Sequence, residues 1–252
     1  MPNIKLNIKR PSFESVKKAY MEINMANPND KNLQRVFKQA IIDNGIWRGI
    51  PAKKAEQIAN EEIDKIINNN YDDFVWQRYA LVGGEPLKEY INHKNFFGRS
   101  YNYADYGNTC ALQVSYALNY GGMPLNTKIQ KGEYNSMQGR NKEHLYILGA
   151  DYVGRFLEAK WGKPEISGAL QNNSDRQAIL TSLQGQIGIA TMRGKHFINN
   201  TPARNFSHTT LWNLNDFVDV QNNTNINFLD EIAQYGYNNI YLAQTFNFWE
   251  LK

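Results

Sequence analysis

The chain contains one cysteine, Cys110, within the stretch Tyr106 to Met123 that reads YGNTCALQVSYALNYGGM. Apolar or small residues follow it at helical spacing, and the pair Gly121 and Gly122 ends the pattern, so we expect Cys110 at the start of a helix. Unpaired N–H groups at such an end carry partial positive charge and stabilise a thiolate, the nucleophilic form of cysteine. A lone cysteine is also commonly a small buried apolar residue, and at this point both interpretations stand.

A cysteine nucleophile needs a base to take its proton and a third polar group to orient that base. Among the four histidines, His208 is the best candidate, because FSHTTLWN at 206–213 has the pattern of a strand and a strand holds a side chain in a fixed position. His196, in RGKHFINN, is expected in a hairpin loop and is a weaker candidate. We expect His93 and His144 to be exposed and to have no catalytic role.

The third member is expected on the strand that follows His208. Asp219, in FVDV, is separated from His208 by the turn-like segment 213–216, and a hairpin there would bring the two side chains together. Asp216, expected within the turn itself, is the alternative. The backbone N–H of Cys110 is a candidate donor to an oxyanion, and the second donor stays unassigned.

The spacing of the other polar residues favours no metal and no cofactor. The cysteine and the histidines form no HExxH or paired-ligand motif. The glycine pairs at 83–84 and 121–122 lack the lysine and flanking pattern of a phosphate-binding loop.

Helical patterns cover the N-terminal part and the middle of the chain. They are expected at 13–23 with Ser12 as N-cap, at 30–44 ending before Gly45, from Pro51 to about 67, at 151–161, and in a short helix starting near Ser174. The segment 76–99 has no clear period. The segment 124–140 has a surface-loop composition and is a candidate rim for a binding cleft.

From Gln186 onward, short alternating segments bounded by asparagine-rich turns predict antiparallel strands at about 187–191, 206–213, 217–220 and 240–251. Helices followed by antiparallel strands indicate an α+β fold, with the nucleophile at a helix start packed on the sheet. We expect one catalytic domain over 1–252.

The net charge of +4 is concentrated near the N-terminus, because residues 1–70 hold 12 Lys and Arg against 8 Asp and Glu. This mild excess could favour an anionic surface or an acidic partner protein, but it lacks the dense basic clusters of a nucleic-acid binder. The start MPNIKLNIKRPSF has no apolar signal-peptide core and no run reaches the length of a membrane span, so we expect neither a signal peptide nor membrane insertion.

At NTCALQVSYALN the sequence resembles the type VI secretion amidase effectors of family 4, within the NlpC-like branch of papain-like peptidases. Further similar segments, in the family's order, are RPSFESVKKAYMEIN at 10–24, VGGEPLKEYIN at 82–92, YILGADYVGRFLEAKWGKPE at 146–165 and SHTTLWN at 207–213. The last is similar to the family's GHxDLWN. The resemblance places the family's base on His208 and its acidic third member on Asp219.

The resemblance implies a papain-like peptidoglycan amidase that cleaves the bond between γ-D-glutamate and meso-diaminopimelate in the wall stem peptides of a rival Gram-negative cell. By the same resemblance, the protein would be made in the cytoplasm, injected by the type VI apparatus, active in the target's periplasm, and neutralised in the producer by a cognate immunity protein. Alternatives are an inactive member that binds wall peptides or a partner, and a papain-fold acyltransferase.

The sequence departs from the family pattern in four respects. The glycine before the histidine is Ser207, and the acidic residue two positions after it is Thr210. Residues 25–75 resemble a helical insertion relative to the compact family core. Some relatives carry a disulfide near the site, which a chain with one cysteine cannot form within itself.

Overall fold

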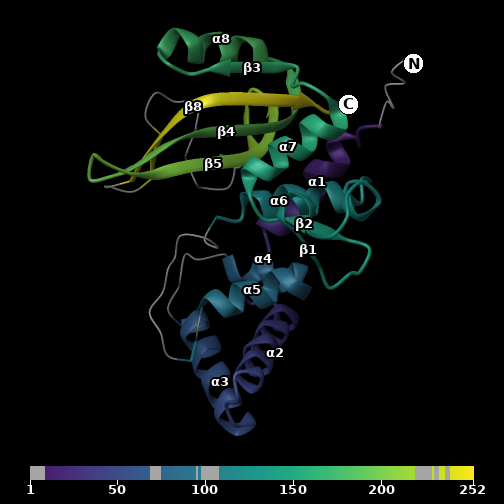
Figure 1. The fold of residues 1–252 in the computed structure, drawn as a ribbon, viewed down its shortest axis with the longest axis vertical. Helices are drawn as coiled ribbons and strands as arrows, with labels where there is room; N and C mark the ends of the chain where they lie inside the picture. The colour runs from purple at the N-terminus through teal and green to yellow at the C-terminus, as the bar shows by residue number, and fades with distance from the viewer. Residues whose placement is uncertain are drawn as a thin grey trace. The chain divides into compact units, whose positions relative to one another are not determined.

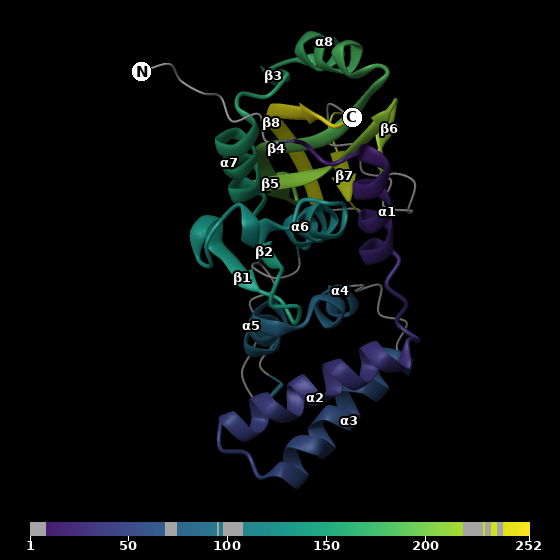
Figure 2. The same ribbon diagram turned by 90° about the vertical axis from the view of Figure 1, so that its right-hand side faces the viewer.

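The computed structural model describes residues 9–68, 75–94, 96–97, 108–218, 229, 233–235 and 239–252. The chain divides into two compact units. We call residues 19–119 and 124–148 the helical unit, and residues 1–18, 120–123 and 149–252 the sheet unit. Helix α1 (Phe13–Asn24) passes from the sheet unit into the helical unit. Figures 1 and 2 show the elements of each unit.

The helical unit has a core of aromatic and branched side chains. Its elements are α2 (Lys31–Trp47), α3 (Ala52–Asn68), α4 (Val75–Val82), α5 (Gly84–Lys94), α6 (Cys110–Tyr120), η1 (Leu125–Thr127), η2 (Glu133–Asn135) and the antiparallel pair β1 (Ser136–Gln138) and β2 (Leu145–Ile147). Phe37 of α2 contacts Trp76 of α4 with ring centroids 5.2 Å apart, and Tyr79 stacks on Tyr90 of α5 at 4.5 Å. Three helices therefore converge on one aromatic cluster.

Local capping signals set the starts of the first helices as expected. The Ser12 hydroxyl accepts a hydrogen bond from the Ser15 N–H at 3.3 Å, and the Asp30 carboxylate accepts one from the Asn32 N–H at 2.8 Å. The expected end of α2 before Gly45 is wrong, because the helix runs to Trp47. A Cβ on Gly45 would lie 2.6 Å from the Phe97 ring and 2.9 Å from Ala55 Cβ, so this glycine permits close packing rather than a helix end.

The stretch without a clear period, 76–99, contains two helices, α4 and α5. Gly83 and Gly84 separate them, both with φ of +63°, a conformation that glycine adopts without strain. A Cβ on Gly84 would lie 2.4 Å from the carbonyl carbon of Gly139. The two helices were missed because each is short and buried on several sides, which removes the amphipathic pattern.

Helix α6 is buried on all sides from Cys110 to Asn119. Polar side chains tie it to its neighbours within the unit. Ser115 Oγ donates to the Ile147 carbonyl at 3.2 Å, Asn119 Nδ2 donates to the Leu145 carbonyl at 2.8 Å, and the Tyr116 hydroxyl donates to Glu22 Oε1 at 2.8 Å. Since buried polar groups need such partners, these bonds fix the position of the helix.

The sheet unit is built on long antiparallel strands. Its elements are α7 (Ala150–Trp161), β3 (Ile166–Ala169), α8 (Asn173–Leu183), β4 (Gln186–Ile198), β5 (Thr201–Leu214), β6 (Asp216–Phe217), β7 (Ala233–Tyr235) and β8 (Asn239–Glu250). Among the described residues, the strand order is β3-β8-β4-β5-β6, and β7 also pairs with β8. The last strand therefore lies inside the sheet, between β3 and β4.

The two faces of this sheet carry different neighbours. Ala190 and Met192 of β4 pack in an apolar cluster with Leu183 of α8. The alternate residue Thr191 faces α7, where a Cβ on Gly154 would lie 3.4 Å from the Thr191 hydroxyl oxygen. Figure 1 shows α7 and α8 on opposite sides of the strands. The expected helices at 151–161 and near Ser174, and the expected α+β class, are confirmed.

No helix in the described part of the chain is both long enough and apolar enough to span a membrane.

Candidate active site

Cys110 is the first residue of α6, as the sequence predicts. Thr109 is the residue before the helix, and its carbonyl accepts the first helical hydrogen bond, from the Gln113 N–H at 2.9 Å. Thr109 is 3% exposed and Cys110 is 4% exposed. The thiol therefore lies at the positive end of a buried helix, where a negative charge is stabilised.

A cation reinforces this end of α6. Arg78 of α4 donates from Nη1 to Thr109 Oγ1 over 2.6 Å, which places a guanidinium beside the residue that precedes Cys110. Helix N-termini and nearby arginines both favour the thiolate form of cysteine. Sequence reasoning did not identify Arg78, because its contact with Thr109 joins positions 31 apart in the chain.

The backbone N–H of Cys110, the candidate oxyanion donor, already has an acceptor. It donates to Asn108 Oδ1 at 3.2 Å, a short-range bond of the kind that asparagine makes with the backbone two residues on. An oxyanion bound at this N–H would have to replace the Asn108 side chain.

His208 lies within β5, as expected, and is half-buried. It is paired with Met192 of β4. The pairing of β5 with β4 is regular from Arg204 to Leu214, and its register shifts only nearer the hairpin, between His196 and Phe197. The next residue, Thr209, is fully buried and its hydroxyl donates to the Ala190 carbonyl at 3.0 Å. The strand therefore fixes His208 on the sheet face that carries Met192.

Of the two candidates for the third member, only Asp216 lies within the described residues, and Asp219 lies outside them. Asp216 opens β6 opposite Asn213, and its carboxylate accepts a hydrogen bond from the neighbouring Phe217 N–H at 2.8 Å. Because Asn213 is five positions from His208 in a regular strand, Asp216 lies on the opposite sheet face from His208.

Two of the other histidines differ from expectation. His196 lies in β4 rather than in a loop, is 4% exposed, and stacks on Tyr241 with ring centroids 4.4 Å apart. The turn comes later, at Asn199 and Asn200, which have φ of +51° and +62°, as two-residue hairpins require. The expected position of His196 was wrong because β4 continues to Ile198, well beyond the segment 187–191 in which apolar and small residues alternate.

His144 was expected to be exposed, but it is buried, with 7% of its surface exposed. Burial lowers its pKa. It lies in the segment that connects β1 to β2, and the centroids of the His144 and Tyr146 rings are 6.4 Å apart in an edge-on arrangement. His93 is exposed as expected.

The expected rim segment, 124–140, is anchored by Glu85 of α5. The carboxylate accepts hydrogen bonds from the Lys131 ammonium and, at 3.0 Å, from the Gln138 N–H. Burial alone would raise the pKa of Glu85, but these two bonds together with the charges of Lys131 and Lys88 outweigh it, and the pKa is lowered. Glu85 follows the glycine pair directly, so this segment holds the 124–140 loop in place.

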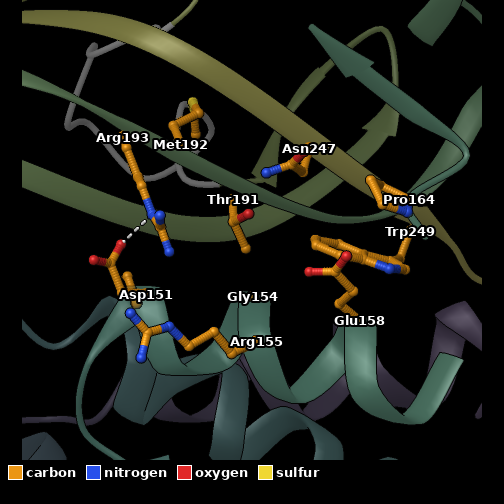
Figure 3. A pocket seen from close by; sticks show the side chains of 11 residues that line it. Asp151, Gly154, Arg155, Glu158, Pro164, Thr191, Met192, Arg193, Asn247 and Trp249 are labelled. Atoms are coloured by element: carbon orange, nitrogen blue, oxygen red, sulfur yellow. Dashed lines mark hydrogen bonds and ion pairs between the residues drawn. The ribbon is translucent and has the colours of Figure 1, made fainter. Parts of the chain in front are cut away.

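A pocket of about 150 Å³ lies within the sheet unit, between α7 and the strands β4 and β8. Figure 3 shows Arg193 paired with Asp151 across its mouth, at 2.7 Å, and Met192 pointing away from α7. Since His208 is paired with Met192, it lies on the other face of the sheet. The pocket therefore contains none of the predicted site residues, and no sequence motif pointed to it.

No group of three or more His, Cys, Asp or Glu side chains that could hold a metal occurs among the residues described above.

Comparison with protein families finds a match over residues 106–235 to the model of type VI secretion system amidase effector protein 4, Tae4. The match covers slightly more than half of the chain. The chain belongs to the Tae4 family. Its matched span contains Cys110, His208 and Asp219. A comparison with curated proteins finds no match.

Solved Tae4 structures share the fold. The effector Tae4 from Salmonella typhimurium, in complex with the immunity protein Tai4 from Enterobacter cloacae, aligns with a TM-score of 0.54 and 18% identity over 96% of this chain and 100% of that chain. A second structure, the Tae4/Tai4 effector–immunity system from Salmonella typhimurium, aligns with a TM-score of 0.51 and 17% identity over 97% and 100%. The papain-like α+β fold expected from the sequence fits this family.

Two departures from the family motif lie beside the histidine of this Tae4 family member. Ser207 is paired with Arg193, and Thr210 is paired with Ala190 and fully buried. Thr210 has the same strand parity as His208, so the methyl and hydroxyl of a threonine occupy the place where the family motif has a carboxylate.

Proposed function

We propose that this Tae4 family member is a peptidoglycan amidase toxin of the NlpC-like type, with Cys110 as nucleophile, His208 as base and Asp219 as orienting group. The observation that carries the proposal is the family match over 106–235, which spans all three residues, together with Cys110 as the first residue of α6. The proposed substrate is the amide bond between γ-D-glutamate and meso-diaminopimelate of the stem peptide.

In the proposed reaction, His208 takes the proton of the Cys110 thiol, and the thiolate sulfur attacks the amide carbonyl carbon. His208 then gives the proton to the leaving amine of diaminopimelate, and the γ-glutamyl group stays on Cys110 as a thioester. Water, deprotonated by His208, attacks the thioester and releases the carboxylate. The proton on His208 returns to the sulfur, and the enzyme is restored.

Of the two candidates for the orienting group, Asp216 is the one whose position the structure describes. Asp216 lies on the sheet face opposite to that of His208 and uses its carboxylate for the Phe217 N–H. An orienting group must reach the ring nitrogen of the base, and this placement of Asp216 favours the other candidate. We therefore keep Asp219 as the proposed third member.

The domain organisation is part of the proposal. The helical unit holds Cys110 and the sheet unit holds His208, and we propose that both serve one catalytic domain over 1–252. Residues 25–75, which include α2 and α3, are proposed as an insertion into the family core. The proposed partners are the type VI apparatus and a cognate immunity protein, since the Salmonella typhimurium Tae4 structures contain Tai4. The proposed place of action is the periplasm of the target cell.

Digestion of purified Gram-negative sacculi tests the activity. The protein should release shortened stem peptides, and mass spectrometry of the products should show new γ-D-glutamate carboxyl ends and diaminopimelate amino ends. The variant Cys110→Ala should release none. Equal release by Cys110→Ala would end the proposal of a cysteine nucleophile, and cleavage at another bond would correct the substrate.

One observation favours an alternative, an inactive member of the fold that binds wall peptides or a partner protein. The Cys110 side chain is almost fully buried, as an inert structural cysteine would be. Alkylation separates the two, because a nucleophilic thiolate reacts quickly with iodoacetamide below neutral pH and a buried thiol does not. A papain-fold acyltransferase remains the second alternative, and aminolysis products in place of hydrolysis products would identify it.

A further inference from the structure

The connection between α2 and α3 exposes two adjacent large apolar side chains. Trp47, the last residue of α2, is 77% exposed, and its neighbour Ile46 is 49% exposed. By contrast, Trp76, Trp212 and Trp249 are at most 3% exposed. Exposed tryptophan is unusual on a protein surface that has no partner, because its burial is strongly favourable.

The turn that carries these side chains is held by backbone hydrogen bonds. The Arg48 N–H donates to the carbonyls of Asn44 and Gly45, and the Ile50 N–H donates to the Gly45 carbonyl at 2.9 Å. Gly49 has φ of +80°, which closes the helix end. Helices α2 and α3 run side by side from this turn in Figures 1 and 2. Ile46 and Trp47 are thus presented by an ordered tip.

The same tip is basic. Arg48, Lys53 and Lys54 are exposed, and the sequence between Asp43 and Glu56 contains no carboxylate. Among the described residues, Lys53 and Lys54 have no carboxylate partner, whereas Glu56 is paired with Lys38 at 3.9 Å. This tip therefore accounts for three of the basic residues in the N-terminal quarter.

We propose that the α2–α3 tip, residues 46–54, docks on the surface of an anionic phospholipid bilayer. Tryptophan prefers the headgroup region, and lysines beside it are attracted to anionic lipids, so the two kinds of side chain suit the same surface. A protein partner fits less well, because a stable protein interface takes about 20 to 30 residues a side, and the tip is a single turn. The docking is peripheral and uses no membrane-spanning helix.

Co-sedimentation with vesicles tests the proposal. The full-length protein should bind vesicles of equimolar phosphatidylcholine and phosphatidylglycerol, bind vesicles of phosphatidylcholine much less, and dissociate as salt is raised. Replacement of both Lys53→Gln and Lys54→Gln should weaken binding about twenty-five-fold, at about fivefold for each charge. Trp47→Ala should weaken it at least about tenfold.

A matched variant changes the same kinds of side chain elsewhere. It combines Met25→Ala, a side chain 68% exposed, with Lys142→Gln and Lys163→Gln, both exposed. This variant should bind anionic vesicles within about twofold of the wild type. A loss equal to that of the tip variants would show general charge attraction and overturn the proposal. Binding to an acidic polypeptide such as polyglutamate as strongly as to anionic vesicles would also overturn it.

Two further readouts separate docking from catalysis. Trp47→Ala should digest sacculi, which contain no bilayer, at the wild-type rate, and Cys110→Ala should bind vesicles as the wild type does. Failure of the amidase proposal would therefore leave this one standing, and the reverse. Tryptophan emission should shift to shorter wavelength on binding anionic vesicles, and Trp47→Phe should remove the shift. A shift that persists in Trp47→Phe would overturn the assignment to the tip.

Discussion

The helical unit and the sheet unit position their candidate catalytic residues in different ways. In the helical unit, most bonds around the start of α6 join residues close in the sequence, such as Asn108 with Cys110 and Thr109 with Gln113, and one, from Arg78 to Thr109, spans 31 positions. In the sheet unit, His208 is placed by the pairing of β5 with β4, which form a hairpin of two long strands, 14 residues in β5 and 13 in β4. The first arrangement depends on a few individual side-chain contacts, most of them short-range at the helix start, and the second depends on a register shared by whole strands.

Substitution of the base should give the largest effect and tests whether the sheet unit contributes to catalysis. His208→Ala should lower kcat/KM on sacculus fragments about ten-thousand-fold, because removal of one triad member leaves only the activity due to binding and the oxyanion site. The melting temperature should change little, since the side chain is only half-buried.

The matched control for this variant is His93→Ala, an exposed histidine of the helical unit, which should retain full activity. Activity within tenfold of the wild type in His208→Ala would remove the sheet unit from the mechanism.

A substitution at Gly194 of β4 tests the register of the sheet directly. A Cβ there would lie 2.0 Å from the Leu242 carbonyl oxygen of β8, next to a register shift in the β4–β8 pairing. Gly194→Ala should lower the free energy of unfolding by roughly 3 kcal/mol, because backbone must move to admit the methyl group.

Gly162→Ala serves as the matched variant, since Gly162 has φ of +88° but nothing within 4 Å of its Cβ position. It should cost only about 1 kcal/mol. Denaturant titration measures both variants, and equal costs would mean that the close approach of β8 is unimportant.

The short-range arrangement can be tested at Asn108, whose side chain accepts the Cys110 N–H. Asn108→Asp should lower kcat about ten- to hundred-fold, since a carboxylate holds the N–H more strongly and repels an oxyanion placed there. Asn108→Ala removes the acceptor without adding charge and should keep most of the activity. Steady-state kinetics at neutral pH measures both, and an unchanged kcat in Asn108→Asp would exclude this N–H as an oxyanion donor.

The smallest effects concern one carboxylate in each unit. Burial is the largest single influence and alone would raise the pKa values of Glu85 and Glu165. The hydrogen bonds and charges of Lys131 and Arg10 respectively, together with backbone N–H donors, outweigh it in sum and lower both pKa values. Each carboxylate therefore stabilises the fold above its ordinary pKa of 4.5, and this contribution is lost as the pH falls through the lowered value.

Both groups are partly exposed, so each should contribute less than about 1 kcal/mol. Glu85→Gln and Glu165→Gln should melt slightly below the wild type at pH 7, and the difference should vanish well below pH 4.5. A difference that persists in acid would assign the effect to packing.

The same contrast explains what the sequence predicts. Helix starts at Ser12 and Asp30, and the helix at Cys110, follow from side chains within a few positions, so they could be predicted. The alternating pattern also predicts His208 on a strand. The expected helix end at Gly45 was wrong because the contacts that require a glycine come from Phe97 and Ala55, which both lie outside α2.

Long-range features could not be predicted. The alternating pattern did not show that β4 continues through His196, nor that burial of α4 and α5 removes their periodicity. Likewise, the salt bridge of Arg10 with Glu165 at 2.7 Å joins residues whose pairing leaves no local signal. The Asp219 role stays a prediction, since this residue lies outside the described part of the chain.

The interior place of β8 has a consequence for biosynthesis. Its partners β3 and β4 are both made earlier, and the backbone carbonyl of Lys252 accepts a hydrogen bond from the Phe13 N–H at 2.9 Å. A nascent chain that has not yet released residues 239–252 from the ribosome lacks the strand that joins β3 to the rest of the sheet. The sheet unit, and His208 with it, is therefore completed only after residues 239–252 have left the ribosome, whereas the contacts around the start of α6 can form earlier.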